Sequence, residues 1–175
     1  MAVKLIVCLT IFFSISVKAK EIEVLMKNKG SNGEKMVFEP ALIRAAVGDT
    51  IKFIAVKNGH QVQSFKGGVP SECSFSTQEF SKEVKSGDCT KGATKNIIKS
   101  KNIKKNKPYS LTINTEGYYA LMCKPHYSMG MVGLIVVGNP KNAASFKTSL
   151  LSKDRKGKKF RGKSLKRMNA ILEQI

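Results

Sequence analysis

Short apolar or alternating runs, separated by turn residues, fill most of the chain from Glu21 to Val137. Valine, isoleucine and aromatic residues are frequent in these runs, and alternation with a period of two is typical of β-strands. Asn58-Gly59 is a tight-turn signal between two of them. The predicted strands are 22–26, 36–47 with a break at Pro40, 50–56, 109–114, 118–122 and 132–137. Many short strands predict an all-β sandwich or barrel, and a proline within a strand predicts a sheet edge.

The pattern changes after Gly138-Asn-Pro140. Apolar residues now recur at helical spacing among basic residues, first from Ala143 to Leu151 and then from Leu165 to Leu172. The basic segment 153–161 joins the two runs. Residues 141–175 are therefore predicted to form two amphipathic α-helices that follow the sheet.

Residues 1–19 have the features of a cleaved export signal. Lys4 precedes the apolar run Leu5–Ile15, and Val17-Lys-Ala19 is a small-residue cleavage site. The run is too short to span a bilayer, so an uncleaved membrane anchor is the weaker alternative. We expect a mature, exported chain of residues 20–175 that forms one domain.

Two histidines, one cysteine and two methionines form the most informative pattern. The chain has only 2 histidines. One is His60, and His126 lies in the segment Cys123-Lys-Pro-His126-Tyr-Ser-Met129-Gly-Met131. One thiolate, two imidazoles and a weakly bound thioether are the ligands of a blue-copper electron-transfer site. We expect Cys123 at the end of a strand and His126 in the following turn, with His60 contributed by a distant strand end.

The cysteine count supports a special role for Cys123. Cleavage of the signal removes Cys8 and leaves an odd number of cysteines. In an oxidising compartment this suggests one disulfide and one other thiol. With Cys123 assigned to the metal, Cys73 and Cys89 remain to pair.

These two cysteines lie in a long interruption of the strand pattern, residues 71–107. Its first part, 71–89, mixes acidic and basic residues, whereas 90–107 contains seven lysines and no acid. A loop of this length in a compact domain needs a tether or a function. We expect a disulfide-stapled surface insertion, and the alternative is a second metal site or a redox-active cysteine pair.

The stretch 21–137, apart from this insertion, resembles the cupredoxin family of blue-copper proteins, and within it the pseudoazurin group. The matching segments are Met36-Val-Phe-Glu-Pro40, Val47-Gly-Asp-Thr50, Asn58-Gly-His60 and Cys123-Lys-Pro-His-Tyr-Ser-Met-Gly-Met-Val-Gly133. The resemblance implies an eight-stranded Greek-key β-sandwich with the two helices as a C-terminal addition. It also implies that this fold binds one copper ion through His60, Cys123, His126 and Met131.

The same resemblance implies a soluble, periplasmic one-electron carrier. Its partners would be redox proteins with acidic docking surfaces, such as a nitrite reductase or a c-type cytochrome. Met129 and Met131 both lie at spacings that blue-copper proteins use, and the segment 127–131 favours Met131 as the axial ligand. Asn28 is expected to brace the site. Gln61 stands where asparagine is usual, and we expect it to donate to the thiolate or to join the two ligand loops.

The charge balance bears on the partner. The chain carries a net charge of +19, and loss of Lys4 and Lys18 with the signal lowers it to +17, so acidic surfaces would attract the exported protein. Lys124 would either point toward the copper or join a docking face around Pro125 and Met129.

Two other function classes share these features. One is a periplasmic copper-binding or copper-delivery protein with the same ligands. The other is a basic module that binds anionic envelope surfaces or nucleic acid. Export argues against nucleic acid. We therefore expect a monomeric carrier that is neither an enzyme nor anchored in a membrane.

Overall fold

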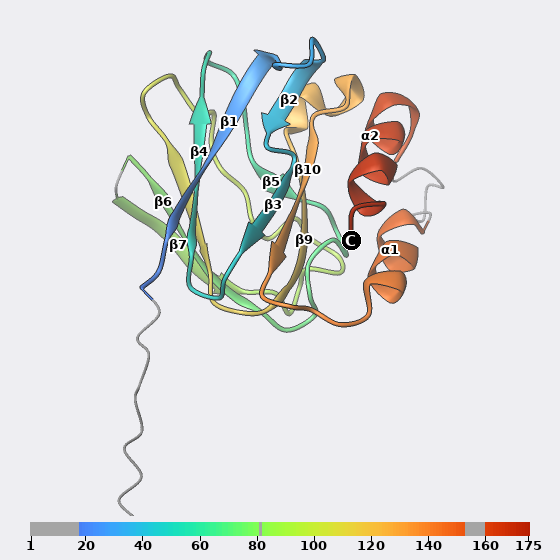
Figure 1. The fold of residues 1–175 in the computed structure, drawn as a ribbon. Helices are drawn as coiled ribbons and strands as arrows, with labels where there is room; N and C mark the ends of the chain where they lie inside the picture. Colours follow the sequence, from blue (N-terminus) through green and yellow to red (C-terminus); the bar gives the residue numbers. More distant parts are fainter. Residues whose placement is uncertain (1–17, 81, 153–159) are drawn as a thin grey trace, which may run out of the picture.

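Ten strands in two sheets, with two helices packed on one side, form the described part of the protein (Figure 1). The computed structural model describes residues 18–80, 82–152 and 160–175. The predicted export signal lies outside these residues except for its last two positions. The strands are β1 (Glu21–Lys29), β2 (Lys35–Glu39), β3 (Leu42–Ala45), β4 (Thr50–Ala55), β5 (Gln63–Ser64), β6 (Ser74–Glu79), β7 (Lys82–Asp88), β8 (Tyr109–Ile113), β9 (Gly117–Met122) and β10 (Val132–Val137). The helices are the 3-10 helix η1 (Lys124–Met129) and the α-helices α1 (Ala143–Leu151) and α2 (Gly162–Leu172).

The strands form a sandwich of a six-stranded and a four-stranded sheet. Their orders are β2-β1-β4-β8-β6-β7 and β3-β10-β9-β5. β1 runs parallel to β4 and β3 parallel to β10, whereas the other neighbours are antiparallel. The predicted all-β sandwich with two C-terminal helices is confirmed. Two strands beyond the expected eight, β6 and β7, come from the segment that we expected to be an insertion.

Pro40 marks the point where the chain crosses between sheets. The run predicted over 36–47 is two strands, with β2 at one edge of the six-stranded sheet and β3 at one edge of the four-stranded sheet. The Glu39–Pro40 peptide bond between them is cis. The edge position predicted from the proline is confirmed, because proline lacks the N–H that an interior strand needs.

Two apolar clusters hold the layers together. The larger lies between the sheets and includes Phe53 and Ile135, which are almost fully buried. The smaller lies between the four-stranded sheet and the helices and includes Leu134 and Met168. Every residue of β10 is buried because this strand faces one cluster on each side, which explains its continuous apolar sequence.

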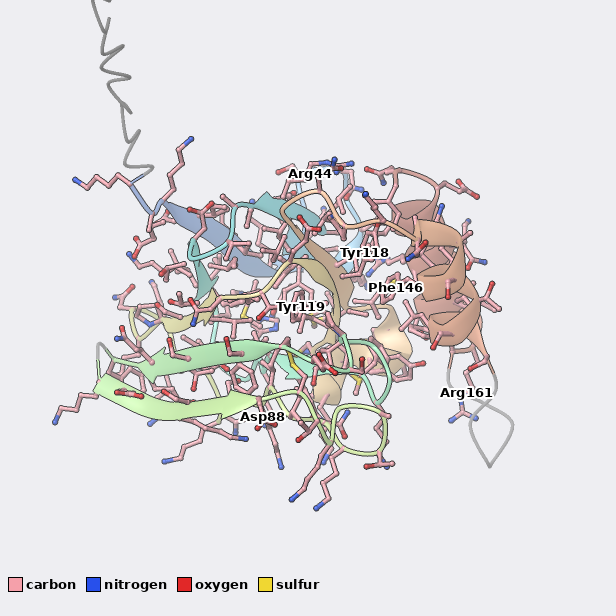
Figure 2. The ribbon with its side chains drawn as sticks, turned by 90° about the horizontal axis from the view of Figure 1, so that it is seen from below. Arg44, Asp88, Tyr118, Tyr119, Phe146 and Arg161 are labelled. Atoms are coloured by element: carbon pink, nitrogen blue, oxygen red, sulfur yellow. A yellow bond between two sulfur atoms is a disulfide. The ribbon has the colours of Figure 1, made fainter. Side chains whose placement is uncertain are left out.

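An aromatic pair attaches α1 to β9. The rings of Tyr118 and Phe146 stack with centroids 4.7 Å apart, and both are labelled in Figure 2. The Tyr118 hydroxyl also donates to the carbonyl of Pro140, 2.9 Å away. The helical appendage is therefore packed against the sheet by apolar and aromatic contacts.

The segment 71–107 differs from the surface loop that the sequence predicted. Its first half is a β-hairpin, because β6 pairs with β8 and β7 pairs with β6, so that β7 becomes the edge of the larger sheet (Figures 1 and 2). The predicted disulfide between Cys73 and Cys89 is confirmed and closes the base of the hairpin, with Cα atoms 5.0 Å apart. The second half returns toward β8 and is anchored by the buried Ile98 and Ile103, while its lysines are exposed. Among the described residues, no helix is long and apolar enough to cross a membrane.

Candidate metal centre

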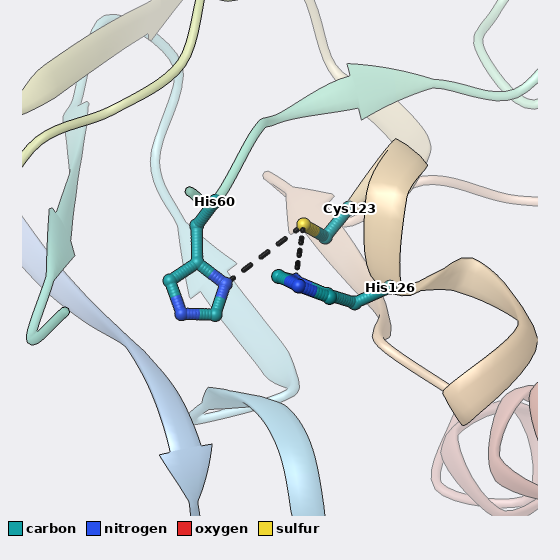
Figure 3. Close-up of side chains that lie close together, drawn as sticks. All are labelled: His60, Cys123 and His126. Carbon is teal, nitrogen blue, oxygen red and sulfur yellow. Dashed lines mark hydrogen bonds between the residues drawn. The ribbon is translucent and has the colours of Figure 1, made fainter. Parts of the chain in front are cut away.

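Three potential metal donors converge at one end of the sandwich. The Cys123 Sγ lies 3.4 Å from the Nδ1 of His126 and 3.9 Å from the Nδ1 of His60 (Figure 3). All three donor atoms lie within 4.8 Å of one another, and this is the only such group found in the part of the chain that the structure describes. His60 comes from the segment that precedes β5, Cys123 from the position between β9 and η1, and His126 from η1.

The backbone between Cys123 and Met131 explains how a short segment presents several donors. Cys123 is the residue before η1, Pro125 lies in its first turn, and Gly130 ends it with a positive φ of 91°. The N–H of His126 donates to the carbonyl of Cys123 at 3.0 Å, which closes the turn. The N–H of Cys123 then donates to the carbonyl of Met131 at 2.9 Å. Met131, the residue before β10, therefore lies directly beside the cysteine.

The two methionines of this segment have different environments. The Met131 side chain is fully buried in the same apolar cluster as Cys123. Met129, at the end of η1, is 37% exposed. Burial beside the three donors favours Met131 as the candidate fourth ligand, whereas Met129 belongs to the surface.

Burial sets the protonation of the donors. It lowers the pKa of His60 to about 4, with a smaller contribution from the nearby His126 ring, and it also lowers the pKa of His126. Burial raises the pKa of the Cys123 thiol, against the opposing effect of the Gln61 and His126 backbone N–H groups. At neutral pH both imidazoles are therefore uncharged and have a free lone pair. The thiol keeps its proton until a cation displaces it.

Hydrogen bonds around the donors fix their orientation. The Nε2 of His60 lies 3.0 Å from the Oδ1 of Asn28. Because an amide oxygen can only accept, the proton of the ring is on Nε2 and the lone pair of Nδ1 faces the cluster. The backbone N–H of Gln61 donates to the Cys123 Sγ at 3.2 Å. Asn28 thus braces the site in the expected place, and the donation expected of Gln61 comes from its main chain.

The side chain of Gln61 has a different partner from the one expected. Its amide nitrogen donates to the Oδ1 of Asn102 at 2.7 Å, so it joins the ligand segment to residues 90–107 and not to the second ligand loop. The N–H of Ile103 also donates to the carbonyl of His60 at 2.8 Å. Sequence analysis missed Asn102, because nothing distinguishes an asparagine within a lysine-rich segment. Lys124 is exposed, so of the two positions expected for it, toward the copper or on the surface, the structure shows the surface.

Comparison with known proteins gives consistent similarities. A sequence model described as "Copper binding proteins, plastocyanin/azurin family" matches residues 24–138. The pseudoazurin of Paracoccus pantotrophus is 34% identical over 154 residues, which cover 87% of this chain and 82% of that protein.

Solved structures agree with the sequence matches. The pseudoazurin of Methylobacterium extorquens AM1 is similar with a TM-score of 0.57 and 30% identity, covering 88% of this chain and 98% of that one. The native pseudoazurin of Hyphomicrobium denitrificans is similar with a TM-score of 0.59 and 28% identity, covering 89% of this chain and 98% of that one. The similarity therefore extends over nearly the whole length of these structures.

Proposed function

Because this chain belongs to the plastocyanin/azurin family of copper-binding proteins, and within it to the pseudoazurins, we propose that it is a blue-copper one-electron carrier. The proposed ligands of its single copper ion are His60, Cys123, His126 and Met131. The observation that carries the proposal is the convergence of one thiol and two imidazole Nδ1 atoms within 4.8 Å.

The donor set fits copper. A soft thiolate with two imidazoles and a thioether is the set that blue-copper sites use, and when bound, copper supplies a one-electron couple between Cu(I) and Cu(II). The protein contributes the geometry. Asn28 holds the His60 ring in the tautomer that can bind, and the N–H of Gln61 stabilises negative charge on the sulfur. Full burial of Cys123 and His60 keeps water from these donors.

Electrons would enter and leave at the His126 edge. His126 is half-buried, whereas His60 and Cys123 are fully buried, so its ring is the donor nearest to solvent. Pro125 and Met129 are exposed next to it in sequence and would provide an apolar contact surface. Small interfaces of this kind suit a carrier that must dissociate quickly from its partners.

The charge of this end supports an acidic partner. Some exposed lysines lie close to the donors in sequence. Others belong to the segment that is joined to the His60 loop by the hydrogen bond from the Lys105 N–H to the Asn58 side chain, at 2.7 Å. Together they are Lys57, Lys104, Lys105, Lys107 and Lys124. The proposed partners are redox proteins with acidic docking surfaces, such as a nitrite reductase or a c-type cytochrome. We also propose that the export signal is cleaved after Ala19 and that the mature protein acts as a monomer in the periplasm.

Reversible electron exchange tests this proposal. The copper-loaded mature protein is reduced with one equivalent of electrons and mixed, in a stopped-flow spectrometer, with an oxidised c-type cytochrome that has an acidic docking surface. A carrier exchanges electrons in milliseconds to seconds without losing its metal, and the rate falls as salt increases, because lysines steer the encounter. A copper-delivery protein would instead transfer the ion to an acceptor and return to the metal-free form, which would refute the carrier function.

A further inference from the structure

One arginine of the C-terminal helix makes an unusual set of contacts beside the metal centre. α2 lies next to η1 (Figure 1), and the side chain of Arg167 reaches from α2 to the end of η1 and to β2. One guanidinium nitrogen, Nη1, donates to the carbonyls of Met36 at 2.8 Å and Gly130 at 2.9 Å, and Nη2 donates to the carbonyl of Lys35 at 2.9 Å. Its Nε lies 3.3 Å from a carboxylate oxygen of Glu34. A single side chain thus joins three segments that are distant in sequence.

The contacted glycine lies at a sensitive place. Gly130 directly precedes Met131 and ends η1 with a φ of 91°, a conformation that favours glycine. A Cβ at this position would lie 3.1 Å from both the Cδ and the Nη1 of Arg167, and 3.2 Å from the Cβ of Lys163. The close approach of α2 therefore also defines the path of the ligand segment at this point.

Backbone hydrogen bonds connect the residue after Gly130 to two of the metal donors. The N–H of Met131 donates to the carbonyl of His126 at 3.2 Å, and the carbonyl of Met131 accepts from Cys123 at 2.9 Å. Met131 follows the glycine along the chain. A shift of the Gly130 peptide therefore changes the position of Met131 relative to His126 and Cys123.

We propose that Arg167 is a positioning residue for the copper site, which holds the peptide between Gly130 and Met131 against β2 and so sets the distance of the axial thioether from the metal. The proposal rests on the proposed function, since it assigns Met131 as a ligand. Arginine is suited to this role because Nη1 holds both segments while Nη2 and Nε, fixed in the same plane, bind further groups beside β2, whereas lysine has only one nitrogen for all of these contacts. The C-terminal helix is then part of the metal site and not only a cover for the sheet.

Matched variants separate this role from general stability. Arg167→Gln removes the guanidinium, and Arg167→Lys keeps the positive charge but leaves a single donor nitrogen. Lys166→Gln is the control, because it removes one positive charge from an exposed neighbour on the same helix. Correct folding of each variant is checked by its far-UV circular dichroism and its unfolding temperature.

The first measurement uses the metal-free protein and is independent of copper. Amide hydrogen exchange at Met131 and Val132 should become roughly tenfold faster in Arg167→Gln, because one charge-assisted hydrogen bond to the preceding carbonyl is lost. Arg167→Lys should fall between this variant and the wild type, and Lys166→Gln should match the wild type. Exchange at wild-type rates in both Arg167 variants would overturn the proposal.

The second measurement uses the copper-loaded protein. A longer and less uniform axial contact should make the electron paramagnetic resonance spectrum of Arg167→Gln more axial and raise its reduction potential, because a weaker thioether stabilises Cu(II) less. A purely structural role would lower the unfolding temperature and leave the spectrum and potential unchanged, which would also overturn the proposal.

If Arg167→Gln does not fold, the same two measurements are made on Arg167→Lys, and their results decide. If the wild type itself shows no blue-copper spectrum, the proposed function fails, while the exchange measurement still decides whether Arg167 holds the loop.

Discussion

The disulfide at the base of the β6–β7 hairpin offers a quantitative test of what this segment contributes. Cys73 and Cys89 are 16 residues apart in sequence, and their side chains are 7% and 0% exposed. Replacing both with alanine opens the covalent loop and removes two buried sulfur atoms. In the chain-entropy description, closure of a loop of about 15 residues stabilises the folded state by ~3 kcal/mol, and removal of a native disulfide costs about 2–5 kcal/mol.

The variant Cys73→Ala/Cys89→Ala should therefore lose about 3 kcal/mol of unfolding free energy, which corresponds to a fall of roughly 6–12 °C in unfolding temperature for a chain of this size. Urea titration monitored by circular dichroism measures the first quantity, and calorimetry the second. The single variant Cys73→Ala is the matched control. It breaks the disulfide but keeps the buried Cys89 thiol. The difference in unfolding free energy between the single and double variants therefore measures the packing of the Cys89 sulfur separately from the effect of loop closure.

The copper spectrum of the double variant should not change. Residues 96–107 keep their own anchors, because Ile98 and Ile103 are buried and the N–H of Ile103 donates to the carbonyl of His60 at 2.8 Å. A loss of less than about 1 kcal/mol would refute the loop-closure reasoning. An altered copper spectrum would show instead that the hairpin helps to hold His60.

The remaining predictions concern the metal site and the acid stability of the fold. Met131→Leu should alter the copper spectrum substantially and Met129→Leu should leave it unchanged, because only Met131 is buried beside the donors; the opposite result would reassign the axial ligand. Asn28→Ala should weaken copper binding by roughly 10–100-fold in competition with a chelator, because the His60 ring loses the partner that fixes its tautomer, and unchanged affinity would contradict that role. The hydrogen bond from Lys27, followed by that from the Ser31 backbone, lowers the pKa of Glu39 from 4.5 to about 2, so its contribution to stability is complete above pH 4.5 and is lost as the pH falls through about 2. An NMR titration of the Glu39 carboxyl with a midpoint near 4.5 would be inconsistent with this interaction.

The sequence predicted the layers of the fold because most strands carry their own pattern. β10 has a continuous apolar sequence, and the two helices show apolar residues at helical spacing, so their burial could be anticipated. The β6–β7 hairpin was missed for a physical reason. The buried positions of β6 after Phe75 are Thr77 and Glu79, whose polar groups are hydrogen-bonded to Lys85 and Lys101, and such a strand has no apolar alternation to detect.

The donors of the metal centre could be anticipated, and the family resemblance also indicated Asn28 as a support, but two other supporting residues could not be anticipated. The chain has only 2 histidines, and a short segment combines one of them with Cys123 and two methionines. The supporting contacts depend on which distant segments meet. Asn102 approaches Gln61 from the lysine-rich segment, and Arg167 approaches Gly130 from the last helix. No local pattern encodes these contacts, because each is set by tertiary packing.

Visible absorption spectroscopy of the purified mature protein titrated with Cu(II) tests the central claim most directly. We predict an intense blue colour from thiolate-to-copper charge transfer that saturates at one copper ion per chain and is lost in Cys123→Ser, because this sulfur is the only thiolate in the cluster. A wild-type protein that binds Cu(II) but remains colourless would contradict the assignment of a blue-copper site.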